Sequence, residues 1–233
     1  MAHVLVTGGP GPTAGHVIVR LLAQGHRVRS TLRSLREEAG VRAVLREAGL
    51  TGDDALTFVE DDLVQDSGWA AAVTGVDHVL HLASPVHTGR VEDEVIVPAR
   101  DGALRVLRAA RDAGVQRVVS TSAFHAVGSG HGHVDRVFTE QDWSPLHGPG
   151  VDAYGRSEIL AERAAWDFIE DDDSGMELRA RAGATVPGRH RRTGDGRGGD
   201  RRGLEARARG PGVEGPDPFH PERRGPAGSP LPR

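Results

Sequence analysis

The sequence predicts an α/β fold in which a parallel sheet is wound with helices on both faces. Two observations carry this prediction. A strand, a glycine turn, a helix and a second strand follow one another in the first 33 residues, and strands alternate with helical stretches as far as residue 178. Such alternation favours parallel pairing, because each helix returns the chain to the same edge of the sheet. The 233 residues suffice for one such domain.

The opening unit begins with an apolar run at residues 3–7, which has the length of a buried strand. Glycines and prolines interrupt it at residues 8–12. Apolar residues then recur at helical spacing from Thr13 until Gly25 ends the helix. A second apolar strand follows at residues 28–32. This order is typical of the first half of a dinucleotide-binding βαβ unit.

The remaining elements are indicated by the same patterns. Predicted strands cover 55–59, 76–83 and 115–121, and predicted helices cover part of 34–50, 69–73, 92–113 and a stretch from Val151 to about Glu170. We expect Ser67 to cap the short helix at 69–73. Met176 to Leu178 can start a sixth strand, but residues 179–183 have the wrong chemistry for a strand buried on both faces.

The glycine turn carries the functional prediction. We expect Gly8 to permit the tight turn, Gly11 to let a pyrophosphate approach the backbone because it has no Cβ, and Ala14 to let the helix lie close to the strand. The free N–H groups and the positive dipole end of the helix would then face the phosphates. The alternative is an ordinary glycine-rich loop. The flanking strand and helix favour a dinucleotide.

The end of the second strand favours NADP over NAD. NAD sites usually place a carboxylate about 20 residues beyond the glycines, where it binds the ribose 2′-hydroxyl. No Asp or Glu occurs before Glu37 in this chain, and Arg29 and Arg33 stand there instead. Their charge suits a 2′-phosphate. The alternative is that both arginines only solvate the end of the strand.

Composition limits the remaining possibilities. The chain has no cysteine, which excludes disulfides and thiolate metal sites. His131 and His133 lie in a glycine-rich loop without supporting spacing, so we predict no metal site. No charged-then-apolar leader and no membrane-length apolar run is present, so we expect a cytoplasmic protein without a membrane partner.

Charge divides the chain into two parts. Residues 179–233 carry a net charge of +7 and residues 1–178 a net charge of −11. Arginine, glycine and proline make up 33 of the last 55 residues, and no apolar periodicity is visible there. We therefore predict a disordered tail. Its composition suggests a GC-rich coding region read in the wrong frame, which intact substrate-domain sequence in a shifted frame would support. A basic tail that binds nucleic acid ranks second, because aromatic residues for stacking are scarce.

Several motifs together give residues 1–178 a resemblance to the extended short-chain dehydrogenase/reductases. These proteins form the NAD-dependent epimerase/dehydratase family, and the dihydroflavonol 4-reductase-like branch is the most similar. The resemblance implies a truncated Rossmann-type sheet, and residues 179–233 depart from the family. The matching motifs are Val6-Thr7-Gly8-Gly9-Pro10-Gly11, Val28-Arg29-Ser30-Thr31-Leu32-Arg33, Asp62-Leu63, His81-Leu82-Ala83-Ser84-Pro85 and Glu162-Arg163-Ala164-Ala165-Trp166-Asp167.

The resemblance also implies roles for individual residues. The reaction would be hydride transfer between NADPH and a small aldehyde or ketone, with Tyr154 giving a proton to the developing alkoxide and contacting the cofactor. Ser122 is the candidate for the hydrogen bond to the carbonyl oxygen. The implied cofactor contacts are Gly8, Gly11 and Ala14 at the pyrophosphate, Arg33 at the 2′-phosphate, Asp62 and Leu63 at the adenine, and Ala83 and Ser84 near the ribose and nicotinamide.

Two positions depart from the family's catalytic pattern. The lysine expected four residues after Tyr154 is Glu158, and the serine expected at the end of the fifth strand is Ala123. A carboxylate beside the phenol should raise the pKa of Tyr154, and Ser122 should point to the opposite face from Ala123. We therefore expect an impaired NADP-dependent oxidoreductase. The alternatives are a catalytically inactive NADP-binding protein and a truncated, non-functional product.

Overall fold

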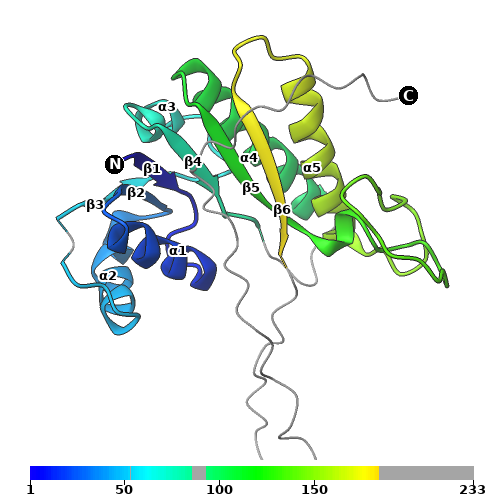
Figure 1. The fold of residues 1–233 in the computed structure, drawn as a ribbon, viewed down its shortest axis with the longest axis horizontal. Coiled ribbons are helices and arrows are strands. Elements are labelled where there is room, and N and C mark those ends of the chain that lie inside the picture. Colours follow the sequence, from blue (N-terminus) through cyan, green and yellow to red (C-terminus); the bar gives the residue numbers. More distant parts are fainter. Residues whose placement is uncertain (53, 86–92, 184–233) are drawn as a thin grey trace, which may run out of the picture. The chain divides into compact units, whose positions relative to one another are not determined.

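The computed structural model of the protein describes residues 1–183 except residue 53 and residues 86–92. Most of the predicted disordered tail therefore lies outside the described residues. In the described part, six strands form one sheet in which all neighbouring strands are parallel (Figure 1). The strand order is β3-β2-β1-β4-β5-β6. This is the doubly wound, Rossmann-type arrangement that the sequence predicts.

The elements follow the predicted order, with ends that shift by a few residues. The first half contains β1 (His3–Val6), α1 (Pro12–Ala23), β2 (Arg27–Leu32), a 3₁₀ turn η1 (Leu35–Glu37), α2 (Glu38–Glu47) and β3 (Leu56–Glu60). The second half contains α3 (Trp69–Val73), β4 (His78–His81), α4 (Asp93–Asp112), β5 (Arg117–Ala123), a 3₁₀ turn η2 (Phe124–Ala126), α5 (Ala153–Glu170) and β6 (Glu177–Gly183).

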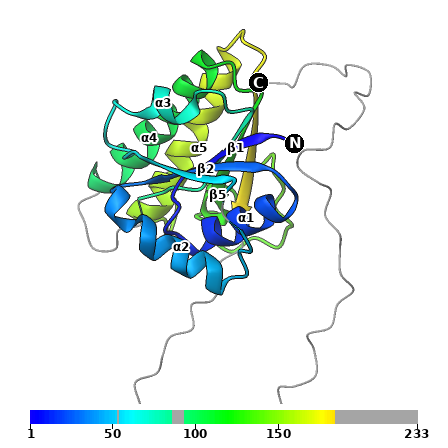
Figure 2. The ribbon, with the colours of Figure 1, turned by 90° about the vertical axis from the view of Figure 1, so that its left-hand side faces the viewer.

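The helices cover opposite faces of the sheet because successive strands are added on both sides of β1, in opposite directions. From β1 it steps to β2 and β3, and from β4 it steps the other way to β5 and β6. Right-handed crossovers in opposite directions place their helices on opposite faces. Accordingly, α1 packs with α2, while α3 and α5 both pack with α4 (Figure 2). Among the described helices, none is both long and apolar enough to cross a bilayer.

The central strand explains why its sequence is an unbroken apolar run. Val4, Leu5 and Val6 of β1 are all 0% exposed, because helices cover both faces of the sheet at this position. Leu5 belongs to a cluster that includes Val79 of β4 and Val118 of β5. The core thus lies under the centre of the sheet, and it fixes the strand ends that carry the candidate site.

The sixth strand corrects the expectation for residues 179–183. β6 runs through these residues and pairs with β5 as far as Gly183. The predicted domain boundary after Leu178 therefore falls inside a strand. Arg179 and Arg181 are tolerated because β6 is an edge strand of the described sheet, where both side chains are exposed. The expectation assumed burial on both faces, which an edge strand does not require.

The start of α3 also differs from the prediction. Gly68, not Ser67, is the N-cap residue, and its φ of 100° lies in the left-handed region. A Cβ at Gly68 would approach Oδ2 of Asp61 to 3.0 Å. A residue without a side chain is therefore required where the chain turns past the end of β3.

One hydroxyl joins the ends of β1 and β4. Thr7 is buried, and its Oγ1 accepts the backbone N–H groups of Leu82 and Ala83, each at 3.0 Å. The same oxygen lies 2.9 Å from Nδ1 of His81. Burial lowers the pKa of His81 to about 4, so the ring is neutral. Because two N–H groups already donate to Oγ1 of Thr7, its own hydroxyl proton is the one left to point at Nδ1 of His81. This network holds the segment after β4 against the turn after β1.

Replacement of this hydroxyl is expected to destabilise the domain. Thr7→Val keeps the shape of the side chain but leaves two N–H groups and Nδ1 of His81 without their partner. The free energy of unfolding should fall by about 2–4 kcal/mol, the cost of unpaired buried polar groups. Thr7→Ser, which retains the hydroxyl, should lose less than half of that. Urea denaturation followed by circular dichroism measures both, and equal losses would contradict this role.

Candidate functional site

The turn between β1 and α1 presents an uncapped helix end. Gly11 is the N-cap residue of α1, no side chain caps the helix, and Pro12 occupies its first turn. The first N–H groups of a helix have no intrahelical acceptor, so this end favours an anion. Ala14 is buried at 1% exposure, where the helix lies against the sheet. The sequence motif is thus placed as predicted, at the carboxyl end of the central strand.

Gly8 brings this turn into close contact with the segment after β4. Its φ is 78°, and a Cβ there would lie 3.1 Å from Cα of Ala83. The Gly8 N–H donates to Oγ1 of Thr31 at 3.0 Å, and the Gly11 N–H donates to the Gly8 carbonyl at 2.9 Å. Because β1 lies between β2 and β4, this contact marks the point where the strand order reverses, and doubly wound sheets bind ligands there.

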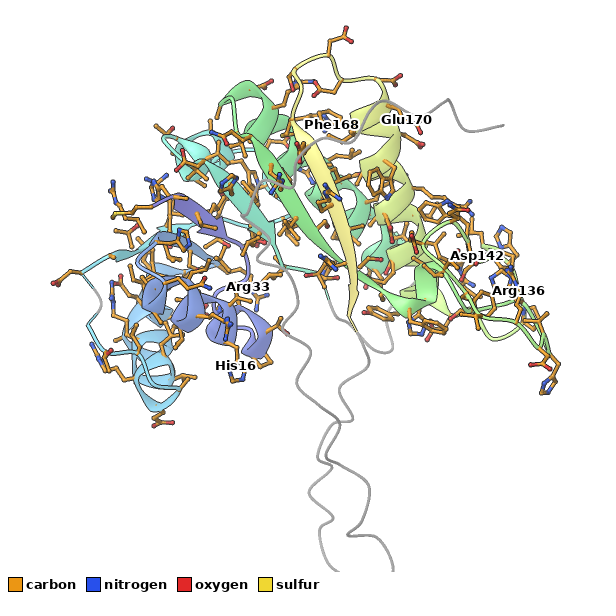
Figure 3. The ribbon with its side chains drawn as sticks, in the orientation of Figure 1. His16, Arg33, Arg136, Asp142, Phe168 and Glu170 are labelled. Carbon is orange, nitrogen blue, oxygen red and sulfur yellow. The ribbon has the colours of Figure 1, made fainter. Side chains whose placement is uncertain are left out.

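Arg29, within β2, and Arg33, just beyond its end, have different surroundings. Arg29 donates from Nη1 to three carbonyl oxygens at the end of α3, those of Ala71, Ala72 and Thr74, at 2.8–3.1 Å. Arg29 therefore caps the C-terminal end of α3, and its guanidinium is not available to a cofactor. Arg33 is exposed beyond the end of β2 (Figure 3), and within the described part of the chain it has no hydrogen bond or ion pair. Of these two arginines, Arg33 is the one that remains available for a phosphate.

The segment after β3 contains a buried acid that the sequence did not single out. Asp61 is 7% exposed, and its Oδ2 has no hydrogen-bond partner among the described residues. Burial raises its pKa to about 6, although its Oδ1 accepts the Asp62 N–H at 2.9 Å. Asp62 itself is half-buried and accepts the N–H of Val64 at 3.1 Å. The predicted pair Asp62 and Leu63 follows directly.

Leu63, predicted to lie at the adenine, packs tightly against α4. A Cβ on Gly102 of α4 would approach Cβ of Leu63 to 2.9 Å, so the helix needs a glycine at this contact. The carbonyl of Leu63 also accepts a hydrogen bond from Arg105 at 2.9 Å. These contacts tie the segment after β3 to α4.

The end of β5 turns Ser122 and Ala123 to different environments. Ser122 is 6% exposed, and its hydroxyl donates to Glu162 of α5. Glu162 also accepts the indole N–H of Trp166 at 3.2 Å. Tyr154 lies two turns before Glu162 on the same helix. In the described structure Ser122 is therefore joined to Glu162 and not to Tyr154, and sequence reasoning missed Glu162 because it lies 40 residues away.

Tyr154 stands half-buried in the first turn of α5. Asp152 is the N-cap residue of the helix, and its side chain accepts the Gly155 N–H at 2.7 Å. The ring of His125 meets the Tyr154 ring edge-on, with centroids 5.4 Å apart. Burial raises the pKa of Tyr154, and the charges of Glu158 and Asp152 raise it further. The predicted direction of this pKa change is thus present, although burial is its first cause.

Glu158 occupies the position one turn after Tyr154. It is 8% exposed, and its Oε1 accepts the Ser84 hydroxyl at 3.1 Å. Burial raises its pKa, the Ser84 hydrogen bond opposes this, and Glu162 adds to the rise. The two carboxylates line a cavity of about 30 Å³ whose polar lining also includes Ser84, Ser122 and His81. No group of side chains suited to a metal ion is found among the described residues.

The raised pKa of Asp61 predicts a pH-dependent stability. The folded state disfavours the ionised carboxyl. The stability that the protonated Asp61 contributes is therefore fully present below about pH 4 and is lost as pH rises through about 6. Asp61→Asn should therefore be more stable than the wild type at pH 8, by on the order of 2 kcal/mol. The difference should vanish near pH 4. Exposed Asp54→Asn is the control, and thermal melts across this range that show a constant difference would contradict the argument.

The chain matches the NAD dependent epimerase/dehydratase family over residues 4–196. It is 34% identical over 189 residues to an uncharacterized oxidoreductase of Schizosaccharomyces pombe, covering 75% of this chain and 55% of that protein. It is 34% identical over 177 residues to dihydroflavonol 4-reductase of Arabidopsis thaliana, covering 72% and 45%. The chain therefore spans about half the length of the curated relatives it matches.

A solved structure supports the same relationship. The structure of Gre2 from Candida albicans in complex with NADPH superposes with a TM-score of 0.65 and 28% identity, covering 77% of this chain and 56% of that one. The predicted resemblance to the reductase-like branch is thus confirmed, and the family match runs past residue 178 to residue 196. The chain belongs to the NAD dependent epimerase/dehydratase family, the extended short-chain dehydrogenase/reductases.

Proposed function

We propose that the chain binds NADP(H) across the carboxyl edge of its sheet and descends from reductases that transfer hydride to a small aldehyde or ketone. The observation that carries the proposal is the uncapped start of α1 behind the Gly8–Gly11 turn, at the point where the strand order reverses. Arg33, free at the end of β2, favours a 2′-phosphate. The NADPH complex of Gre2 supports the same cofactor. We also propose that the protein is cytoplasmic.

Residues at different strand ends would each bind a different part of the cofactor. Gly8, Gly11 and Ala14 would hold the pyrophosphate, and Arg33 the 2′-phosphate. The other predicted contacts are Asp62 and Leu63 at the adenine, and Ala83, Ser84 and Tyr154 at the nicotinamide half. When bound, the reduced cofactor supplies the hydride. Tyr154, whose raised pKa keeps its phenol protonated, would hold the proton for the alkoxide oxygen.

Two observations favour a second candidate, an NADP-binding protein without catalysis. Glu158 places a carboxylate where a cation would lower the pKa of Tyr154, and the chain contains no lysine. Ser122 is engaged by Glu162, and Ala123, at the position where the family's serine is expected, has no hydroxyl to offer a carbonyl oxygen. We therefore propose that turnover is impaired. A third reading, a truncated non-functional product, requires that the purified chain show no cooperative thermal transition.

Cofactor choice is tested by titrating the full chain with NADPH and NADH while following nucleotide fluorescence. NADPH should bind more tightly. Arg33→Ala should weaken NADPH binding about tenfold, the effect of losing one charge-assisted pair, and should leave NADH binding unchanged. Arg20→Ala, at the exposed far end of α1, is the matched control. Equal affinity for both nucleotides, or an Arg33→Ala variant that loses both equally, would contradict the 2′-phosphate role.

Restoration of the missing groups tests whether the site is impaired rather than unrelated to reduction. Glu158→Lys combined with Ala123→Ser should raise NADPH-dependent reduction of an aldehyde panel by at least tenfold over the wild type, since it returns a cation and a hydroxyl to Tyr154. Each single variant and a cofactor-binding measurement are the controls. A folded double variant that binds NADPH without any gain in rate would show that the limit lies elsewhere.

A further inference from the structure

The order of the strands tells which half of a dinucleotide Glu158 faces. A dinucleotide bound to a doubly wound sheet spans both halves at the switch point. Here Arg33 lies on the β2 side of β1, and Ser84 and Glu158 lie on the β4 and α5 side. If Arg33 binds the 2′-phosphate of the adenosine half, the nicotinamide half extends toward Glu158. This step rests on the proposed function.

The charged neighbour that acts on Glu158 is itself acidic, Glu162. Glu158 is 8% exposed and fixed by Ser84, and no basic side chain of the described residues pairs with it. Glu162 follows one turn later, Asp152 lies at the start of the helix, and His81 is neutral. Burial raises the pKa of Glu158, and a nearby positive charge favours its ionised form. The two charges then interact strongly because the local dielectric constant is low.

The two redox forms of the cofactor differ in the charge of one ring. The nicotinamide of NADP⁺ carries a positive charge, and that of NADPH is neutral, while the phosphates and both riboses are the same. We propose that Glu158 makes this site select the oxidised cofactor, so that the chain binds NADP⁺ more tightly than NADPH. The preference works against carbonyl reduction, because reduction consumes NADPH and leaves NADP⁺ bound.

Isothermal titration of the full chain with NADP⁺ and with NADPH tests the selectivity. The wild type should bind NADP⁺ at least fivefold more tightly, which equals about 1 kcal/mol. Glu158→Gln keeps the shape and a partner for Ser84 but removes the charge, and it should shift the ratio toward NADPH by at least fivefold. Glu158→Met, a second uncharged side chain of similar length, should give the same shift.

The control is Glu170→Gln, which removes one negative charge from the exposed end of the same helix (Figure 3). Glu170 lies 12 positions after Glu158, about 18 Å along the helix axis. Its ratio should equal that of the wild type. Binding of both nucleotides with a ratio that neither Glu158 variant changes overturns the selectivity alone. Binding of neither nucleotide by a folded wild type overturns the proposed function together with it.

Discussion

The contact between Gly8 and Ala83 constrains every other part of the site. The two backbones come so close that a Cβ on Gly8 would lie 3.1 Å from Cα of Ala83. Thr7 reinforces the contact by holding the N–H of Ala83. Gly8 leads directly into the turn that positions α1, and Ala83 leads directly into Ser84. Because Ser84 binds Glu158, the same contact also sets where α5 meets the sheet.

Local patterns were enough to predict the elements that this contact joins. The apolar run of β1 reflects burial on both faces, which any central parallel strand must have. The glycine turn was visible because Gly8 and Gly11 lie between a strand and a helix. The parallel, doubly wound arrangement followed from the alternation of strands and helices, because right-handed crossovers leave few other topologies. None of these inferences required knowledge of a distant partner.

Predictions that depended on a distant partner were less complete. Arg29 and Arg33 are equivalent in the sequence, but the acceptors of Arg29 lie more than 40 residues further along the chain. Glu162 as the partner of Ser122 is a contact of the same kind. β6 was misjudged because a strand's place at the edge of a sheet is a property of the whole sheet. The cap of α3 lies at Gly68 and not at Ser67, and position 68 favours a glycine because Asp61, just beyond β3, leaves little room for a side chain.

The inner face of α5 shows how fold and chemistry separate in this chain. Tyr154, Glu158 and Glu162 recur every four residues, so one stripe of the helix carries all three toward the sheet. Both carboxylates of this stripe have hydrogen-bond partners, because Ser84 donates to Glu158 and Ser122 donates to Glu162. Hydrogen bonding therefore permits acids at these positions, whereas the proton transfer proposed for Tyr154 would be favoured by a cation. A helix can thus pack correctly while its charges oppose the chemistry proposed for it, so the fold alone does not decide what the site can do.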